Sequence, residues 1–468
     1  MPYEGERASK VSHFDIVRNP DVQKFLSECT VIRVPSPEEA TKIISIFSDF
    51  VVDENVRLPK SVLAVDGSLH EAQRDRQFPS TRVGYIKIGL MLVSLDEFAS
   101  LRPAGEFFVD PFRLARLQNQ ADSLTFTLPS SNVKLKDCST VRESFRIQLN
   151  SELDAEKTCP GGDKNFSLLK ILMLLASERE GPLRTGNPNQ VKLHKCPACG
   201  FDDSPILVVY GADNRCPDCL APVYPADCLR LWEAVSEYGG NVEPLTRAMN
   251  YVEHLSLVQH IQYLNQRSPE ALSNLCFFVD GPLACFGNAA WLHAQIMRAI
   301  YDAQENLRAK RLPEFLIIGL QKSGQVVEHA RSLERLLPAG KYAAISDEYR
   351  GNYIAQRPEG WEKTFGHETY YGQDFIFRTD TGQIFVFALP YPMRSKEPIG
   401  EFRETKANSD MYTCLRTALH LIRHFELDLY QNAVIPIALA HRHASISLVP
   451  GGRVLDLLTA TAIKLREL

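Results

Sequence analysis

The sequence has no long hydrophobic run, and this absence argues against a protein that spans a membrane through helices. No stretch approaches the roughly 18 consecutive apolar residues that a membrane-spanning helix needs. The first thirty residues hold no apolar segment of the signal-peptide type, and no internal repeat or low-complexity segment is visible. We therefore expect a folded cytoplasmic protein that makes no contact with a membrane.

A strong excess of one charge is also absent. With 52 Lys and Arg against 57 Asp and Glu, the formal net charge is −5. This excludes a uniformly basic nucleic-acid coat, but net charge does not decide whether a local basic groove exists. The 468 residues allow about three domains, and the 44% hydrophobic content is enough for a core without disulfides.

Three catalytic motifs are missing from the chain. There is no G-x-x-x-x-G-K-[ST], so ATP hydrolysis through a P-loop is not expected. Neither H-E-x-x-H nor G-x-S-x-G occurs, which argues against a zinc protease and against a serine hydrolase with a nucleophile elbow.

Eleven cysteines are present, an odd number, and four of them form two C-x-x-C pairs. Cys196 and Cys199 are separated from Cys216 and Cys219 by sixteen residues. Four thiolates at this spacing predict a closed structural Zn²⁺ site in a zinc ribbon, with a strand between the pairs. The alternative is a pair of redox dithiols. A closed site leaves no open coordination position, so we assign it no catalysis.

Two apolar runs end in the same tripeptide, Val-Asp-Gly. Asp66 and Asp280 would lie at the ends of strands, where open α/β sheets bind their ligands. The glycines that follow, Gly67 and Gly281, would let the backbone turn sharply beside an ion. The alternative is that each aspartate caps the next helix.

Glu253 lies in an almost wholly apolar stretch of the helix predicted over 246–266. A carboxylate there is costly unless it is paired or binds metal, so the alternative is a buried salt bridge. Together with Asp66 and Asp280 it would form an oxygen-rich cluster suited to Mg²⁺ or Mn²⁺. Such clusters support two-metal hydrolysis of phosphodiesters.

Two further candidates follow apolar runs. His441 ends the segment 434–441, and as part of a strand it would share a face with His443. His441 could bind metal or transfer a proton, or it could be a hydrogen-bonded structural histidine. Lys322 follows the strand predicted at 314–321 and could hold a phosphate, although exposed lysines are common.

Apolar periodicity predicts a mixed α/β core, in which one hairpin joins strands that otherwise alternate with helices. The predicted strands are 61–68, 85–95, 274–282 and 314–321, with the hairpin at 375–390; the predicted helices are 14–29, 35–52, 112–120, 142–156, 166–180, 246–266, 291–310, 409–425 and 451–468.

These motifs, in this order, resemble the NurA nuclease family. The resemblance is carried by AVDGS at 64–68, Glu253 in RAMNYVEHLSLVQHI, FFVDGPL at 277–283, GLQKSG at 319–324 and ALAH at 438–441. It covers roughly 50–98 and 245–460. In the family a tyrosine precedes the histidine by a short interval. Here the nearest one, Tyr430, is further upstream, so that role has no assigned residue.

The resemblance implies an RNase H-like fold, a mixed sheet flanked by helices, and we expect the zinc ribbon to be inserted into it. The zinc ribbon is not part of this resemblance, because the stretch 100–245 that contains it looks like an insertion relative to a minimal member of the family. The resemblance implies Mn²⁺ or Mg²⁺ at Asp66, Glu253, Asp280 and His441, and DNase activity on single-stranded DNA and DNA ends. Family members form dimers and dock on a HerA-like hexameric ATPase, which would supply the work this chain cannot. The domains expected are 1–99, the first part of the core; 100–245, an insertion with the ribbon at about 194–222; and 246–468, the rest of the core.

Two other functions fit the same residues. The chain could be a catalytically silent scaffold that binds DNA through the zinc ribbon and recruits a motor. It could also be a metal-dependent phosphoesterase that acts on small substrates through the same carboxylates. For the nuclease, DNA end processing in repair and defence against invading DNA are equally compatible with the sequence.

Overall fold

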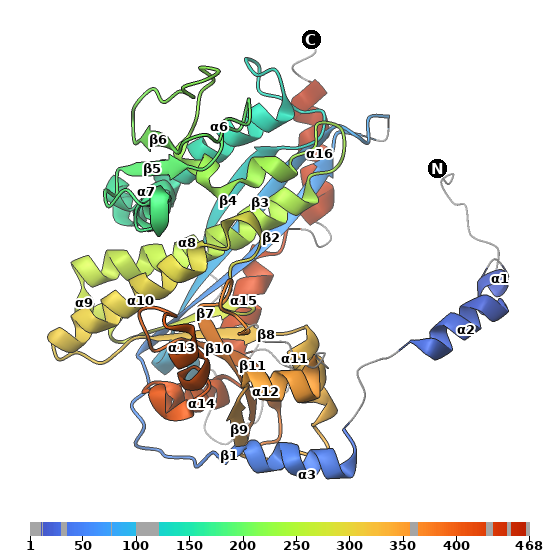
Figure 1. Cartoon of the computed structure of the whole chain (residues 1–468), viewed down its shortest axis with the longest axis vertical. Helices are drawn as coiled ribbons and strands as arrows, with labels where there is room; N and C mark the ends of the chain where they lie inside the picture. Colours follow the sequence, from blue (N-terminus) through green and yellow to red (C-terminus); the bar gives the residue numbers. More distant parts are fainter. Residues whose placement is uncertain are drawn as a thin grey trace.

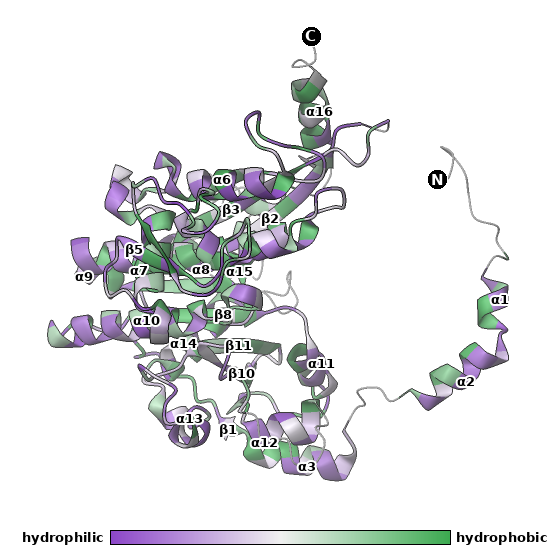
Figure 2. Cartoon of the chain, turned by 45° about the horizontal axis from the view of Figure 1, so that its top comes forward, coloured by the Kyte–Doolittle hydropathy of each residue, from purple (hydrophilic) through white to green (hydrophobic). Residues whose placement is uncertain are grey.

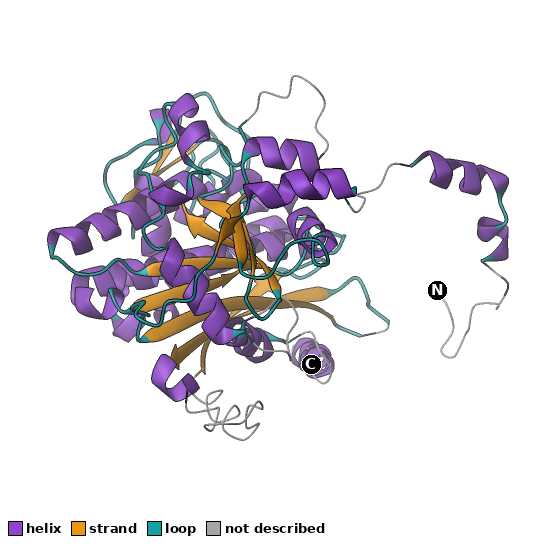
Figure 3. Cartoon of the chain, turned by 90° about the horizontal axis from the view of Figure 1, so that it is seen from below, coloured by secondary structure: helices purple, strands orange, loops and turns teal. Residues whose placement is uncertain are grey.

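The computed structural model describes residues 11, 13–29, 35–75, 77–99, 121–355, 364–426, 434–446 and 451–464. A large mixed sheet lies between layers of helices (Figure 1, Figure 3). The helix expected over 112–120, and Tyr430, lie outside the described residues. Within the described residues, no helix combines the length and the apolar character needed to span a bilayer.

The main sheet has nine strands in the order β1-β9-β10-β11-β8-β7-β2-β3-β4. Only β2, β7 and β8 run parallel to one another, and the other neighbouring pairs are antiparallel. The strands are β1 (Ser48–Asp49), β2 (Ser61–Gln73), β3 (Arg82–Ser94), β4 (Ala121–Pro129), β7 (Leu275–Asp280), β8 (Leu316–Gln321), β9 (Lys341–Ala344), β10 (Gly372–Arg378) and β11 (Ile384–Pro390), while β5 (Gln190–Leu193) and β6 (Ile206–Val209) form a separate pair.

Helices pack on both faces of this sheet, although the two nearest the N-terminus, over 14–17 and 20–28, contain no buried residue. Their bounds are α1 (Phe14–Val17), α2 (Pro20–Glu28), α3 (Pro37–Ile46), α4 (Leu95–Ala99), α6 (Val141–Asp154), α7 (Leu168–Ser177), α8 (Val242–Arg267), α9 (Pro269–Leu272), α10 (Leu292–Ala309), α11 (Gln325–Ser332), α12 (Asp347–Tyr349), α13 (Ile399–Thr405), α14 (Leu415–Phe425), α15 (Ile435–Ala444) and α16 (Gly451–Lys464). Figure 2 shows apolar residues gathered on the central strands and polar ones on the outer sides of the helices.

Residue alternation along β2 decides which helix meets which side chain. Leu63 and Val65 belong to the core beneath α6, α7, α8 and α10. Val62 and Ala64 belong to the core beneath α14 and α15. The even-numbered residues of β2 therefore face α15 and the odd-numbered ones face α8, which matters for Asp66 and Gly67.

The parallel part of the sheet is shorter than β2 itself. β2 pairs with β7 only from Ser61 to Val65, whereas it pairs with β3 along all thirteen residues to Gln73. The sequence predicted a strand that ends at Asp66, and this was wrong because pairing with β3 continues the strand. Asp66 instead lies just beyond the last residue of β2 that pairs with β7.

Two other predictions need correction. The run 434–441 was expected to be a strand, but it forms α15, which has Pro436 in its first turn. An apolar run this short does not distinguish a strand from a buried helix, and proline favours a helix start. The helix expected over 14–29 is two helices, because Asn19 caps α2 and Pro20 begins it.

The segment 121–245 contributes both to the main sheet and to a separate lobe. β4 joins the edge of the sheet beside β3, and α6 and α7 share the core of α8. A buried bidentate ion pair holds this lobe together, with Arg146 Nε and one guanidinium NH₂ each 2.7 Å from the Asp227 carboxylate oxygens. The division into 1–99, 100–245 and 246–468 stays a prediction.

We expect Asp227→Ala to lower the free energy of unfolding by about 3–5 kcal/mol, because Arg146 would keep its charge in a buried place without a partner. Both side chains are almost fully buried. Urea unfolding of the whole chain measures this. The control is Asp213→Ala, whose pair with Arg215 is exposed and should cost no more than about 1 kcal/mol. Equal effects of the two substitutions would contradict the assignment.

Candidate metal centre

Asp66 and Asp280 meet at the point where the parallel pairing of β2 and β7 stops. Asp66 is buried and belongs to the even-numbered face of β2. Asp280 is the last residue of β7 and is partly exposed. Gly281 follows it with a φ of 101°, so the turn predicted after this aspartate is confirmed. Asp280 therefore lies at the strand end, the usual ligand position in open α/β sheets.

His441 completes a compact group of three ligands. Its Nδ1 lies 2.8 Å from Asp66 Oδ2, and one donor atom from each of Asp66, Asp280 and His441 can be chosen so that all lie within 4.8 Å of one another. The side chain of His441 is half exposed. It belongs to the last turn of α15, and its neighbour His443 points elsewhere because residues two apart on a helix do not share a face. The shared strand face expected from sequence is therefore absent.

Lys322 stands beside this group. It follows β8, the strand next to β7, and its Nζ lies 2.8 Å from Asp280 Oδ2. About a third of its side chain is exposed. Lys322 thus neutralises part of the negative charge and remains accessible from solvent.

Glu253 approaches from the opposite face of the sheet. It lies on α8, is almost fully buried, and faces β2 at Gly67. A Cβ at residue 67 would come within 2.5 Å of Glu253 Oε1 and 2.7 Å of Met249 Cγ. Gly67 was expected to allow a sharp turn, but it lies inside β2 and its φ is not in the left-handed region. Its lack of a side chain instead makes room for the glutamate.

Gly89 has the corresponding role for α15. It is the β3 partner of Asp66 in register. A Cβ there would lie 3.0 Å from the carbonyl oxygen of Ala440 and 3.2 Å from the backbone nitrogen of Ala444. α15 can therefore lie close enough to the sheet for His441 to reach Asp66. Sequence reasoning missed Gly89, although a glycine inside a strand pattern is a recognised sign of close backbone approach.

Crowding of carboxylates shifts their titration. The pKa of Asp66 is raised to about 6, mainly by burial and then by the charge of Asp280, while Lys322 and His441 act to lower it. Burial also raises the pKa of Glu253 well above its ordinary value, followed by the charges of Asp66 and Asp280. Both carboxyls therefore hold their protons to a higher pH than ordinary carboxyls do, Asp66 up to about pH 6, and a cation would compete with these protons.

The donor set fits a divalent metal ion. Two carboxylates and an imidazole nitrogen suit Mn²⁺, and the carboxylates alone suit Mg²⁺. The unfavourable charge of the buried carboxylates is what such an ion would relieve. Glu253 lies outside the compact group of three, so Asp66, Asp280 and His441 are the residues that would hold the ion first, with Glu253 beneath them.

Four cysteines form a second group with the geometry of a metal site. One Sγ from each of Cys196, Cys199, Cys216 and Cys219 lies within 4.8 Å of the others. In both C-x-x-C turns the residue after the second cysteine has a positive φ, 82° at Gly200 and 59° at Leu220. The strand expected between the pairs is β6. Four thiolates suit a structural Zn²⁺ ion.

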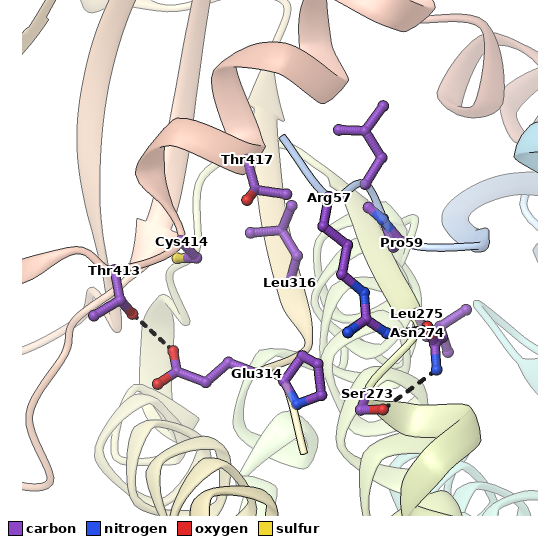
Figure 4. A pocket seen from close by; sticks show the side chains of 12 residues that line it. Arg57, Pro59, Ser273, Asn274, Leu275, Glu314, Leu316, Thr413, Cys414 and Thr417 are labelled. Carbon is purple, nitrogen blue, oxygen red and sulfur yellow. Dashed lines mark hydrogen bonds between the residues drawn. The ribbon is translucent and has the colours of Figure 1, made fainter. Parts of the chain in front are cut away.

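A separate pocket lies at the other end of the same parallel strands (Figure 4). It measures about 270 Å³ and includes Leu275 and Leu316, the first residues of β7 and β8. Thr413 donates a hydrogen bond to Glu314 across it, at 2.8 Å. None of the five candidate residues Asp66, Glu253, Asp280, Lys322 and His441 lines this pocket.

Comparison with known proteins gives a likeness to solved structures but none to known sequences. No protein-family model matches the chain, and no curated protein sequence matches it. The chain is similar to the crystal structure of the NurA nuclease from Sulfolobus solfataricus, with 8% sequence identity and a TM-score of 0.36, over 97% of this chain and 95% of that one. That protein carries the same family name that the sequence motifs suggest. A likeness this slight assigns no activity, so function has to be inferred from the site.

We expect Gly67→Ala to weaken Mn²⁺ binding at least about tenfold, because the new methyl group displaces Glu253 from beneath the ligands. Isothermal titration of metal-free protein with MnCl₂ measures this. Gly400→Ala is the matched control, since a Cβ there meets nothing within 4 Å. Unchanged Mn²⁺ affinity in Gly67→Ala would show that the glutamate does not support the site.

Stabilisation by Mn²⁺ should depend on pH. The pKa of Asp66 is about 6 in the folded chain against an ordinary 3.8, so folding of the metal-free protein takes up protons in this range. Its free energy of unfolding should therefore fall as the pH rises from about 4 to about 6. Mn²⁺ displaces these protons, so its effect on Tm should be small near pH 5 and large near pH 7.

Thermal unfolding with and without Mn²⁺ at both pH values checks this expectation. Asp66→Asn has no carboxylate to titrate, so much of the pH dependence should disappear in that variant. An equal Mn²⁺-induced shift of Tm at both pH values in the unsubstituted chain would refute the coupling.

Proposed function

We propose that this chain is a divalent-metal-dependent DNA nuclease of the NurA type, which acts on single-stranded DNA and DNA ends. The observation that carries the proposal is the group formed by Asp66, Asp280 and His441, with donor atoms within 4.8 Å of one another. Lys322 and Glu253 flank it. A carboxylate and imidazole set beside an accessible lysine suits hydrolysis of a phosphodiester.

The proposed fold is RNase H-like. The strands β4, β3 and β2 form an antiparallel meander, and β7 and β8 continue the sheet in parallel with β2. Asp66 lies on the central strand of these five and Asp280 on its parallel neighbour. This order supports the proposal, because it puts both carboxylates just beyond the last residues of β2 and β7 that pair with each other.

The geometry suggests a chemical role for each of these residues. Asp66, Asp280 and His441 would hold one or two Mn²⁺ or Mg²⁺ ions, which when bound lower the pKa of water and polarise the phosphate. Lys322 donates to Asp280 and can turn its remaining N–H groups towards a phosphate oxygen. Water attacks phosphorus, the ester bond to one sugar oxygen breaks, and that oxygen leaves as a hydroxyl after it takes a proton from solvent. His441, half exposed and oriented by Asp66, would either complete this ligand set or, when it does not bind an ion, accept the proton that the water loses.

Other parts of the proposal concern partners. We propose a HerA-like hexameric ATPase as the partner, because the chain has no P-loop of its own. The working form would be a homodimer. The four-cysteine group would hold structural Zn²⁺ in the lobe beside the core. A role in DNA end processing or in defence against invading DNA follows from this pairing of nuclease and motor.

Asp66→Asn should reduce cleavage of single-stranded DNA in Mn²⁺ by more than about a hundredfold, because it removes one negative ligand without changing the shape of the side chain. Gel analysis of a labelled oligonucleotide with Mn²⁺, with Mg²⁺ and with chelator measures this. Asp49→Asn, an exposed site at the far edge of the sheet, serves as the control.

Three outcomes separate the nuclease from its rivals. Equal cleavage by Asp66→Asn and the unsubstituted chain would overturn the assignment of the site. Binding of DNA without cleavage under any metal would favour the zinc-ribbon scaffold. Hydrolysis of small phosphoesters with DNA left intact would favour the phosphoesterase.

A further inference from the structure

Lys87 lies on the same face of the sheet as Asp66, one strand away. It belongs to β3 and is paired in register with Ser68, whereas the partner of Asp66 is Gly89. Lys87 is therefore the diagonal neighbour of Asp66 on an antiparallel pair, a position about 7–8 Å away. Long side chains reach across this distance.

The contacts of Lys87 show that it faces α15. Its Nζ donates to the carbonyl oxygen of His443 at 2.7 Å, and His443 is two residues from His441 in the last turn of the same helix. Asp66 and Lys87 thus contact α15 within one turn of each other. Both lie under the edge of α15 that borders the metal centre.

Lys87 carries a charge that the described part of the chain does not balance. Its recorded hydrogen bond is to a carbonyl oxygen, and no carboxylate among the described residues forms an ion pair with it. Partial burial lowers the pKa of its ammonium group. An ammonium group has three N–H donors, so a contact with the end of α15 leaves two for another acceptor.

A phosphodiester chain supplies such acceptors beside a cleavage site. When one phosphate lies at Asp66 and Asp280, the next phosphate follows one nucleotide further along the strand. A long side chain whose strand position is offset from Asp66 by about 7–8 Å can reach it. Lys322 serves the same side of the centre as Asp280, whereas Lys87 lies on the β3 side of Asp66. The two lysines therefore stand on opposite sides of the carboxylates.

We propose that Lys87 binds the phosphate adjacent to the one that is cleaved, so that a DNA strand crosses the metal centre from the β8 side towards β3. This proposal rests on the proposed nuclease function. The competing explanation is purely structural: a lysine at the C-terminal end of α15 stabilises the helix dipole, and its loss would displace His441.

The test compares substrates with and without a second phosphate. Lys87→Ala should raise KM for a single-stranded oligonucleotide about tenfold in Mn²⁺, as expected for one lost charged contact. It should leave hydrolysis of bis(p-nitrophenyl) phosphate, which has one phosphodiester and no neighbour, unchanged. The dependence of log KM on log salt should become shallower by about 0.7, the contribution of one phosphate on a single strand.

A neutral methylphosphonate next to the cleaved phosphate completes the test. In the unsubstituted chain it should reproduce the rise in KM, and in Lys87→Ala it should add nothing further. Lys87→Arg should retain the oligonucleotide KM within about threefold, because it keeps the charge. Lys192→Ala is the matched control, since Lys192 is also a strand lysine whose Nζ donates to backbone carbonyls, in the separate β5–β6 pair.

The results distinguish the phosphate contact of Lys87 from a purely structural role, and both from a failure of the proposed nuclease function. Loss of activity on both substrates, with weaker Mn²⁺ binding, would overturn the proposal in favour of the structural role. Unchanged oligonucleotide KM in Lys87→Ala would also overturn it. Absence of cleavage by the unsubstituted chain would instead refute the nuclease function. In that case an unchanged affinity of Lys87→Ala for the oligonucleotide in Ca²⁺ would refute the contact as well.

Discussion

Mutual repulsion among buried carboxylates is the constraint on which the rest of the structure depends. Asp66, Asp280 and Glu253 come from two strands and a helix and meet at one place. The charge of Asp280 helps to raise the pKa of Asp66, and the charges of Asp66 and Asp280 help to raise the pKa of Glu253. Such an arrangement is unfavourable by itself, and only protons or a cation can relieve it. The surrounding chain must therefore hold these groups together against their charge, and the sheet, its helices and two glycines together do so.

The sheet sets where the carboxylates lie, and two glycines allow the helices on its two faces to come close. Parallel pairing of β2 and β7 stops at Val65, so Asp66 and Asp280 lie where the backbone no longer needs to continue the ladder between these strands. Gly67 admits Glu253 from the α8 face, and Gly89 admits α15 from the other. A single layer of strands is thereby approached by polar groups from both sides, which large residues at these two positions would prevent.

Much of the site could be predicted from the sequence, because its ligands end apolar runs or interrupt an apolar helix. Asp280, Gly281, Lys322 and Glu253 were recognisable in this way. The conformation around His441 was not, since an apolar run of seven residues fits a strand or a buried helix equally well. The length of β2 and the segments that approach Gly67 and Gly89 could not be predicted either, although a glycine within a strand already indicates a close approach of some kind. They depend on contacts between segments far apart in the chain, which local periodicity does not record.

The separation of the ligands along the chain has a consequence for how the protein is made. His441 hydrogen-bonds Asp66 across 375 residues of sequence, and α15 covers the even-numbered face of β2. During synthesis, β2, α8 and β7 all emerge before α15 does. An unfinished chain therefore has the carboxylates but neither the histidine nor the helix that shields them. In the proposed nuclease, a nascent or truncated chain that lacks α15 would therefore have an incomplete metal centre.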